Sequence, residues 1–75
     1  MWIMSKDKSL IINSEKCIAY DLHKNSIGLY SISLQYNNYE KFEELGSYCN
    51  HEEAQKAFED LYYNLKDNFN AMKML

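Results

Sequence analysis

The sequence predicts an α+β fold in which a small antiparallel sheet of four or five strands is packed by one long C-terminal helix. Apolar and polar residues alternate from Cys17 to Leu22 and again from Leu29 to Tyr36, which is the period of a half-buried strand. From Ala54 to Leu75 the apolar residues instead recur at steps of three and four, which is the period of an amphipathic helix. Strands followed by a single helix are typical of the α+β class.

The predicted sheet consists of short strands joined by polar turns. Trp2 to Met4 and Leu10 to Asn13 are apolar runs on either side of a polar segment, which is the pattern of a hairpin. Asn37-Asn38 favours a tight two-residue turn after the second alternating strand. The last strand runs from about Tyr39 to Tyr48, and Gly46 within it indicates a bulge.

One face of the two alternating strands is apolar and is expected to cover the core. The residues on that face are Ile18, Tyr20, Leu22, Tyr30, Ile32 and Leu34. Aromatic rings supply the bulk that a small core needs. The aromatic residues assigned to the core are Tyr20, Tyr30, Phe42, Phe58, Tyr62 and Phe69.

The helix is predicted to begin at Asn50 or His51. An Asn side chain accepts hydrogen bonds from the N–H groups of a first helical turn, and Glu53 stands at the capping-box position. A helix from His51 to about Met72 would be roughly 30 Å long at about 1.5 Å per residue, whereas strands of five or six residues cover about 17–20 Å. The C-terminal end of the helix is therefore predicted to extend beyond the sheet.

This overhang predicts a homo-oligomer, most simply a dimer. Its apolar groups would lie in water in a monomer, and burial of one such side chain contributes about 1.5–3 kcal/mol. Asn68 lies on the apolar stripe, where a polar residue can fix the register between two helices. The predicted interface consists of Leu65, Asn68, Phe69, Met72 and Leu75. The alternative, which the sequence leaves open, is that residues 70–75 fray as chain ends do.

Length and charge exclude several classes of protein. The 75 residues form one domain, 1–75, divided into a β-meander over 1–49 and an amphipathic helix over 50–74. The net charge is −3 and every basic residue is Lys. Without a basic patch or Arg contacts to phosphate and guanine, no DNA or RNA partner is expected.

The apolar run from Met1 to Met4 is too short for a signal peptide or a membrane span, so we expect a cytoplasmic protein without a membrane partner.

Several short motifs together resemble a group of small proteins of Firmicutes and their phages. The motifs are the Met-Trp start at Met1-Trp2, the Leu-Gly-x-Tyr of Leu45 to Tyr48 and the Glu-Glu-Ala of Glu52 to Ala54. The resemblance covers nearly the whole chain. It implies a strand meander followed by one helix, reminiscent of a small PH-like sheet, and a gene carried by a phage or mobile element. The group has no recognised catalytic residues, so the resemblance implies none here.

The residues that carry chemistry do not form a catalytic or metal-binding motif. Cys49, His51 and Glu52 lie close together in sequence, but structural zinc sites need about four ligands and a Cys nucleophile needs an oriented base. This segment is more simply a strand end and a helix cap. We therefore expect no metal, no cofactor and no enzymatic activity.

Exposed aromatic residues are the best candidates for partner contacts. Trp2 lies on a short terminal strand expected at a sheet edge, Tyr39 stands at a hairpin shoulder, and Tyr63 projects from the polar side of the helix. Trp and Tyr are enriched at interfaces and can also stack on a nucleobase. Lys24 is a candidate contact for an isolated anion.

The sequence therefore predicts a non-enzymatic binding protein encoded by a phage or mobile element. Its expected role is counter-defence in the host cytosol, in which it binds and inhibits a host defence protein or sequesters the nucleotide signal of that defence. The alternative is a regulatory or assembly subunit that acts through helix-mediated protein contacts.

Overall fold

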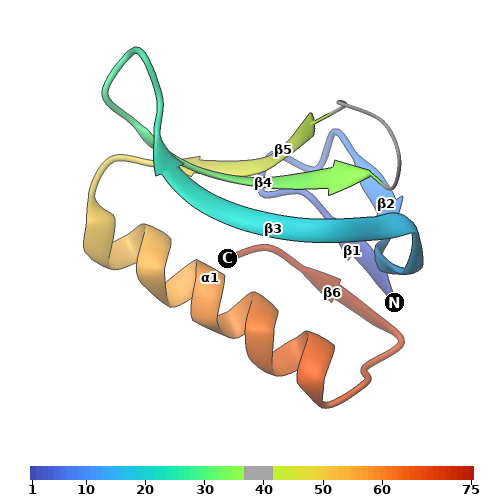
Figure 1. Cartoon of the computed structure of the whole chain (residues 1–75). Helices are drawn as coiled ribbons and strands as arrows, with labels where there is room; N and C mark the ends of the chain where they lie inside the picture. The colour runs from blue at the N-terminus through green and yellow to red at the C-terminus, as the bar shows by residue number, and fades with distance from the viewer. Residues whose placement is uncertain (37–41) are drawn as a thin grey trace.

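The computed structural model of the chain describes residues 1–36 and 42–75. Its elements are, in chain order, β1 (Trp2–Met4), β2 (Ile11–Asn13), the 3₁₀ helix η1 (Ser14–Lys16), β3 (Cys17–Lys24), β4 (Tyr30–Tyr36), β5 (Phe42–Tyr48), α1 (His51–Lys66) and β6 (Ala71–Lys73). The α+β class is confirmed, and α1 packs against one face of the β3-β4-β5 sheet (Figure 1). The predicted turn at Asn37-Asn38 and the start of the last strand at Tyr39 lie outside the described residues.

The strands form two sheets, and the prediction of one sheet with four or five strands is wrong. One sheet has the order β2-β1-β6 and the other has the order β3-β4-β5. The predicted hairpin of β1 and β2 is confirmed, as is the antiparallel meander of β3, β4 and β5. Between β2 and β3 the chain turns through η1, where the Asn13 side chain accepts a hydrogen bond from the Glu15 N–H. This turn ends the first sheet and redirects the chain, so β3 begins a new sheet.

The start of α1 is as predicted. Asn50 has an extended backbone conformation, and its side-chain oxygen accepts a hydrogen bond from the Glu53 N–H at 2.8 Å. The buried residues of the helix include Ala54, Ala57 and Leu61. They recur at steps of three and four, so the amphipathic pattern does place one stripe of the helix on the sheet.

The end of α1 differs from the prediction, because the helix stops at Lys66 and does not continue to Met72 or beyond. Asn68 has a φ of 59°, a left-handed conformation that Asn adopts more readily than most residues. The N–H of Phe69 bonds to the carbonyl of Asn64, and the N–H of Asn68 bonds to the carbonyl of Leu65. These two bonds form a Schellman motif, which closes the helix and reverses the chain. Asn68 is thus a turn residue and not a register residue on a helical seam.

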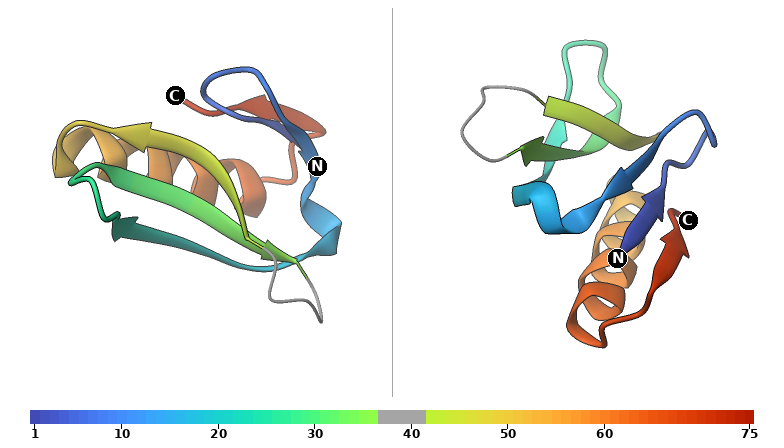
Figure 2. Two further views of the ribbon diagram at one scale, coloured as in Figure 1. Left: turned by 90° about the horizontal axis from the view of Figure 1, so that it is seen from above. Right: turned by 90° about the vertical axis from the view of Figure 1, so that its right-hand side faces the viewer.

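After this turn the chain returns to the sheet as β6, so the predicted overhang is wrong. Figure 2 shows β6 beside β1, and the two strands pair in parallel, with Ala71 opposite Trp2 and Lys73 opposite Met4. Met74 donates its backbone N–H to the carbonyl of Met4. The Tyr48 hydroxyl donates to the carbonyl of Leu75 at 2.8 Å. Residues 70–75 are therefore held in place, and the fraying alternative is wrong as well.

The core lies between the two sheets and α1. It contains side chains from the first sheet, from the second sheet, from the helix and from the C-terminal segment. The buried apolar residues are Ile3, Ile12, Ile32, Leu34, Leu45, Tyr48, Ala54, Ala57, Leu61 and Met74. Of the aromatic residues assigned to the core, Tyr20, Tyr30 and Phe58 are partly buried against it, whereas Phe42, Tyr62 and Phe69 are exposed and their assignment is wrong.

The bulge predicted near Gly46 is confirmed, and it joins the two sheets. The register between β4 and β5 shifts between Ile32 and Ser33, which leaves Leu45 as the extra residue of β5. The backbone N–H of Lys6, in the turn after β1, donates to the carbonyl of Leu45 at 2.7 Å. A Cβ on Gly46 would lie 3.1 Å from the Lys6 Cβ and 2.9 Å from the Tyr48 hydroxyl. The missing side chain of Gly46 therefore lets the turn approach the bulge closely.

The turn between β1 and β2 is organised by one carboxylate. Asp7 Oδ1 accepts hydrogen bonds from the hydroxyls of Ser5 and Ser9 and from the Ser9 N–H. These bonds favour the charged form, and they lower the pKa of Asp7 from an ordinary 3.8 to about 2.

We predict that Met74 contributes strongly to stability although it lies next to the exposed Leu75. Met74 is 2% exposed and Leu75 is 61% exposed. Met74→Ala should lower the free energy of unfolding by about 2–5 kcal/mol, the range for large-to-small core changes. Leu75→Ala should change it by at most about 0.5 kcal/mol, because its backbone carbonyl still accepts from Tyr48. Urea unfolding of both variants tests this, and equal effects would contradict the position of Met74 in the core.

We predict that Asp7 stabilises the fold only above acidic pH. Since its pKa is lower in the folded state than in the unfolded state, the contribution is complete above about pH 4 and is lost as the pH falls toward 2. Asp7→Asn should therefore be less stable than the parent at pH 6, and the difference should disappear at pH 2. Denaturant midpoints of both proteins across this range test the sign. A difference that is constant with pH would show that the hydrogen bonds do not depend on the charge.

Candidate functional site

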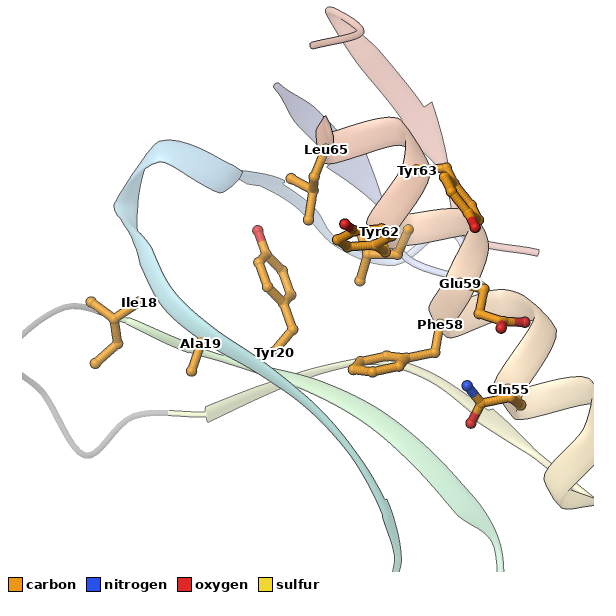
Figure 3. Close-up of a pocket in the computed structure, with 10 residues that line it drawn as sticks. Ile18, Ala19, Tyr20, Gln55, Phe58, Glu59, Tyr62, Tyr63 and Leu65 are labelled. Atoms are coloured by element: carbon orange, nitrogen blue, oxygen red, sulfur yellow. The ribbon is translucent and has the colours of Figure 1, made fainter. Parts of the chain in front are cut away.

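A groove lined mostly by apolar residues lies between β3 and α1. It encloses about 600 Å³, and it is lined by Ile18, Ala19, Tyr20, Gln55, Phe58, Glu59, Leu61, Tyr62, Tyr63 and Leu65. Phe58 and Tyr62 of α1 face Tyr20 of β3 across this space (Figure 3). Among the lining residues that the structure describes, Glu59 is the one with a charged side chain. A cavity of this size and composition fits apolar groups far better than phosphates.

The β3 side of the groove is shaped by a bulge. Cys17 pairs with Tyr36 and Ala19 pairs with Gln35, so Ile18 is an extra residue without an opposite partner. The bulge turns Ile18 out of the core, and 57% of it is exposed. The prediction that Ile18 shares the core face with Tyr20 and Leu22 is therefore wrong.

Helix α1 carries a stripe of four residues that we call the helix seam: Gln55, Glu59, Tyr62 and Lys66. The first three line the groove, and Lys66 continues the stripe at the end of the helix. The steps of four, three and four keep these residues within about 60° of one another around the helix axis. Tyr62 is 58% exposed and Tyr63 is 55% exposed. The two rings lie edge to face with centroids 5.3 Å apart. The seam thus has an acidic residue, an aromatic centre and a basic residue in succession.

The floor of the groove contains a buried hydroxyl. Tyr20 Oη makes no hydrogen bond of good geometry with the residues described, although Cys17 and Ser14 lie near enough to affect its pKa. The thiol of the nearby Cys17 donates to the carbonyl of Asn13 at 3.9 Å instead. Burial raises the pKa of Tyr20 above its ordinary value, and Cys17 raises it further. The hydroxyl therefore stays protonated and contributes bulk to the groove.

A second apolar surface covers the outer face of the first sheet. The register places Ile3, Ile12 and Met72 on one face of β2-β1-β6, where Ile3 and Ile12 are buried. The opposite face, which we call the outer sheet face, carries Trp2, Met4, Ile11, Asn13, Ala71 and Lys73. Trp2 is 55% exposed on this face. It lies on the middle strand of the sheet and not at the edge where it was predicted, since β1 pairs with both β2 and β6.

The predicted contact residues do not form one site. Trp2 is exposed on the outer sheet face, Tyr63 is exposed at the groove, and Tyr39 lies outside the described residues. Lys24 lies away from the groove lining, with its Nζ 5.8 Å from the centroid of the Tyr30 ring. Tyr30 in turn meets His51 edge to face, at 5.4 Å between ring centroids.

The predicted oligomer interface is dispersed by the early end of α1. Leu65 lines the groove, Asn68 forms the helix-ending turn, and Met72 is partly buried against the core. Phe69 and Leu75 are exposed, but they no longer continue a helical stripe. The residues that sequence reasoning missed are Glu59, Tyr62 and Lys66. Their heptad-like spacing was a usable signal, but Glu59 and Lys66 were assigned to the solvated face of the helix and Tyr62 was assigned to the core.

The described residues were also compared with the requirements of a metal site and of a membrane-spanning helix. In residues 1–36 and 42–75, no three His, Cys, Asp or Glu side chains gather as a metal site would require. Within the same ranges no helix is long and apolar enough to cross a membrane.

We predict that removing the Tyr20 hydroxyl will not destabilise the protein. A buried hydroxyl without a partner costs about 1–3 kcal/mol, so Tyr20→Phe should leave the free energy of unfolding unchanged or raise it by about 1 kcal/mol. Tyr48→Phe is the matched control, because it loses the hydrogen bond to Leu75 and should lower stability by about 1 kcal/mol. Urea unfolding separates the two, and an equal loss in both variants would show that Tyr20 Oη does have a partner.

Comparisons with known proteins identify no relative whose functional residues could be compared with those of this chain. No protein-family model, no curated protein and no solved structure matches this chain. The resemblance to small phage proteins therefore stays a prediction, and the two surfaces are the basis for the proposals that follow.

Proposed function

We propose that the protein is a non-enzymatic binding protein and that it contacts a partner protein through the outer sheet face. The observation that carries this proposal is the register of β1, which buries Ile3 and leaves Trp2 exposed on the opposite side. Trp is the residue type most enriched among binding hot spots. The surrounding Met4 and Ile11 supply an apolar centre, and Asn13 and Lys73 supply a polar rim, which is the usual anatomy of a protein interface.

A protein partner is supported better than a nucleotide signal. Capture of a multiply charged phosphate needs several cationic groups directed at one point. Among residues 1–36 and 42–75, Lys73 is the one basic residue assigned to the outer sheet face, and the groove lining contains Glu59 but no Lys. Apolar surfaces with few charges instead favour the burial of side chains from another protein.

In this proposal the protein acts in counter-defence by occupying a host defence protein. The resemblance to phage proteins supports the phage context of this role but leaves the function itself open. A small domain can inhibit by covering a surface that its target needs, and this requires no turnover. The alternative is a regulatory or assembly subunit that acts through helix-mediated protein contacts, so it would use α1 and not the outer sheet face.

The test compares two exposed apolar residues on different surfaces. Trp2→Glu should weaken capture of the partner from a lysate of host cells by about 30-fold or more, since hot-spot residues contribute at least about 2 kcal/mol. Ile27→Glu is the matched control, because Ile27 is highly exposed in the turn between β3 and β4. Quantitative mass spectrometry of the captured proteins provides the measurement, and thermal melts confirm that both variants fold. Equal capture by the parent and by Trp2→Glu would exclude the outer sheet face.

A further inference from the structure

We propose that the helix seam and the adjoining groove form the interface of a homodimer. In this dimer a second copy of the chain lies across the groove with its α1 antiparallel to that of the first copy. The aromatic pair Tyr62 and Tyr63 lies at the centre, and Glu59 of each copy meets Lys66 of the other. This surface is separate from the outer sheet face, so the proposal does not depend on the proposed function.

The order of residues along the seam makes it complementary to itself. A twofold axis perpendicular to a helix places that helix antiparallel to its own copy. Glu59 and Lys66 lie at equal distances in sequence from the midpoint between Tyr62 and Tyr63. When that midpoint lies on the axis, Glu59 faces Lys66 of the second copy, and the symmetry repeats the pair. The spacing of four, three and four is also that of a coiled-coil seam.

The exposed aromatic groups supply the apolar area that the contact needs. Tyr62 and Tyr63 together leave two large rings more than half exposed, directly beside a groove lined by Phe58 and Leu65. Tyr at the centre of an interface, surrounded by groups that exclude water, is a common hot-spot arrangement. Tyr63 also has Lys66 Nζ 5.9 Å from its ring centroid, so the basic end of the seam already lies beside the aromatic centre.

An extended peptide that adds to the edge of β3 is the competing occupant. β3 is an edge strand, and an unpaired edge next to a groove can receive a peptide strand. However, this edge is interrupted by the bulge at Ile18 and carries the exposed acidic residue Asp21, whose Oδ1 lies 2.7 Å from Nδ1 of His23. Bulges and charges are features that protect an edge from strand addition. A peptide would also leave the complementary charges of the seam unexplained.

Charge exchange tests the seam without knowledge of any external ligand. Sedimentation equilibrium should show a dimer whose dissociation constant lies in the micromolar range. Glu59→Lys and Lys66→Glu should each weaken the dimer by about tenfold, because each places like charges in contact twice. The double exchange Glu59→Lys with Lys66→Glu should restore the parent affinity to within about threefold. Matched controls are Glu53→Lys and Lys56→Glu, which change the net charge equally on other exposed positions of α1 and should leave the affinity unchanged.

Two further variants locate the contact. Tyr62→Glu should abolish the dimer while the protein keeps its thermal transition, since more than half of Tyr62 lies in solvent. Trp2→Glu should leave the dimer intact. A parent that remains monomeric up to about 1 mM would overturn the proposal and favour the peptide. A dimer that survives Tyr62→Glu, or a double exchange that fails to restore affinity, would also overturn it.

Discussion

The parallel pairing of β6 with β1 is the contact on which the rest of the structure depends. β1 and β2 have three residues each, and an isolated hairpin of that size is not stable in water. The third strand completes a sheet whose inner face, with Ile3 and Ile12, is covered by the second sheet and α1. It also carries Met74 into the core. The outer sheet face includes Ala71 and Lys73 only because β6 is in place.

A smaller contact fixes the relative position of the two sheets. The turn after β1 reaches β5 at its bulge, where the Lys6 N–H bonds to Leu45 and the Lys6 side chain bonds to the Ser47 carbonyl. The Lys6 ammonium also lies 4.1 Å from the centroid of the Tyr48 ring. Tyr48 in turn holds the carbonyl of Leu75. These contacts connect the N-terminal turn, the bulged strand and the C-terminal segment around one aromatic residue.

Local signals in the sequence predicted the elements that depend on local interactions. The cap at Asn50, the first hairpin, the alternating strands and the bulge at Gly46 each have a cause within a few residues. The end of α1 was missed because Met72 and Leu75 continue the helical spacing, although Asn68 was a turn signal within it. The pairing of β6 with β1 has no local signature, since it joins segments from opposite ends of the sequence. For the site, the exposure of Trp2 and Tyr63 was predicted. Tyr62 was assigned to the core because it lies beside the apolar stripe of the helix, but it is exposed.

The contact between β1 and β6 also sets the order in which the molecule can form. Helix α1 and the hairpins close short loops, so they form from neighbouring residues. The β1-β6 ladder instead closes a loop that contains almost the entire polypeptide, and the entropy of that closure must be overcome before Met74 is buried. We therefore expect the β3-β4-β5 sheet with α1 to act as the folding nucleus and the three-stranded sheet to be assembled last. Translation delivers β1 well before its partner β6, so β1 remains unpaired on that side until β6 has left the ribosome.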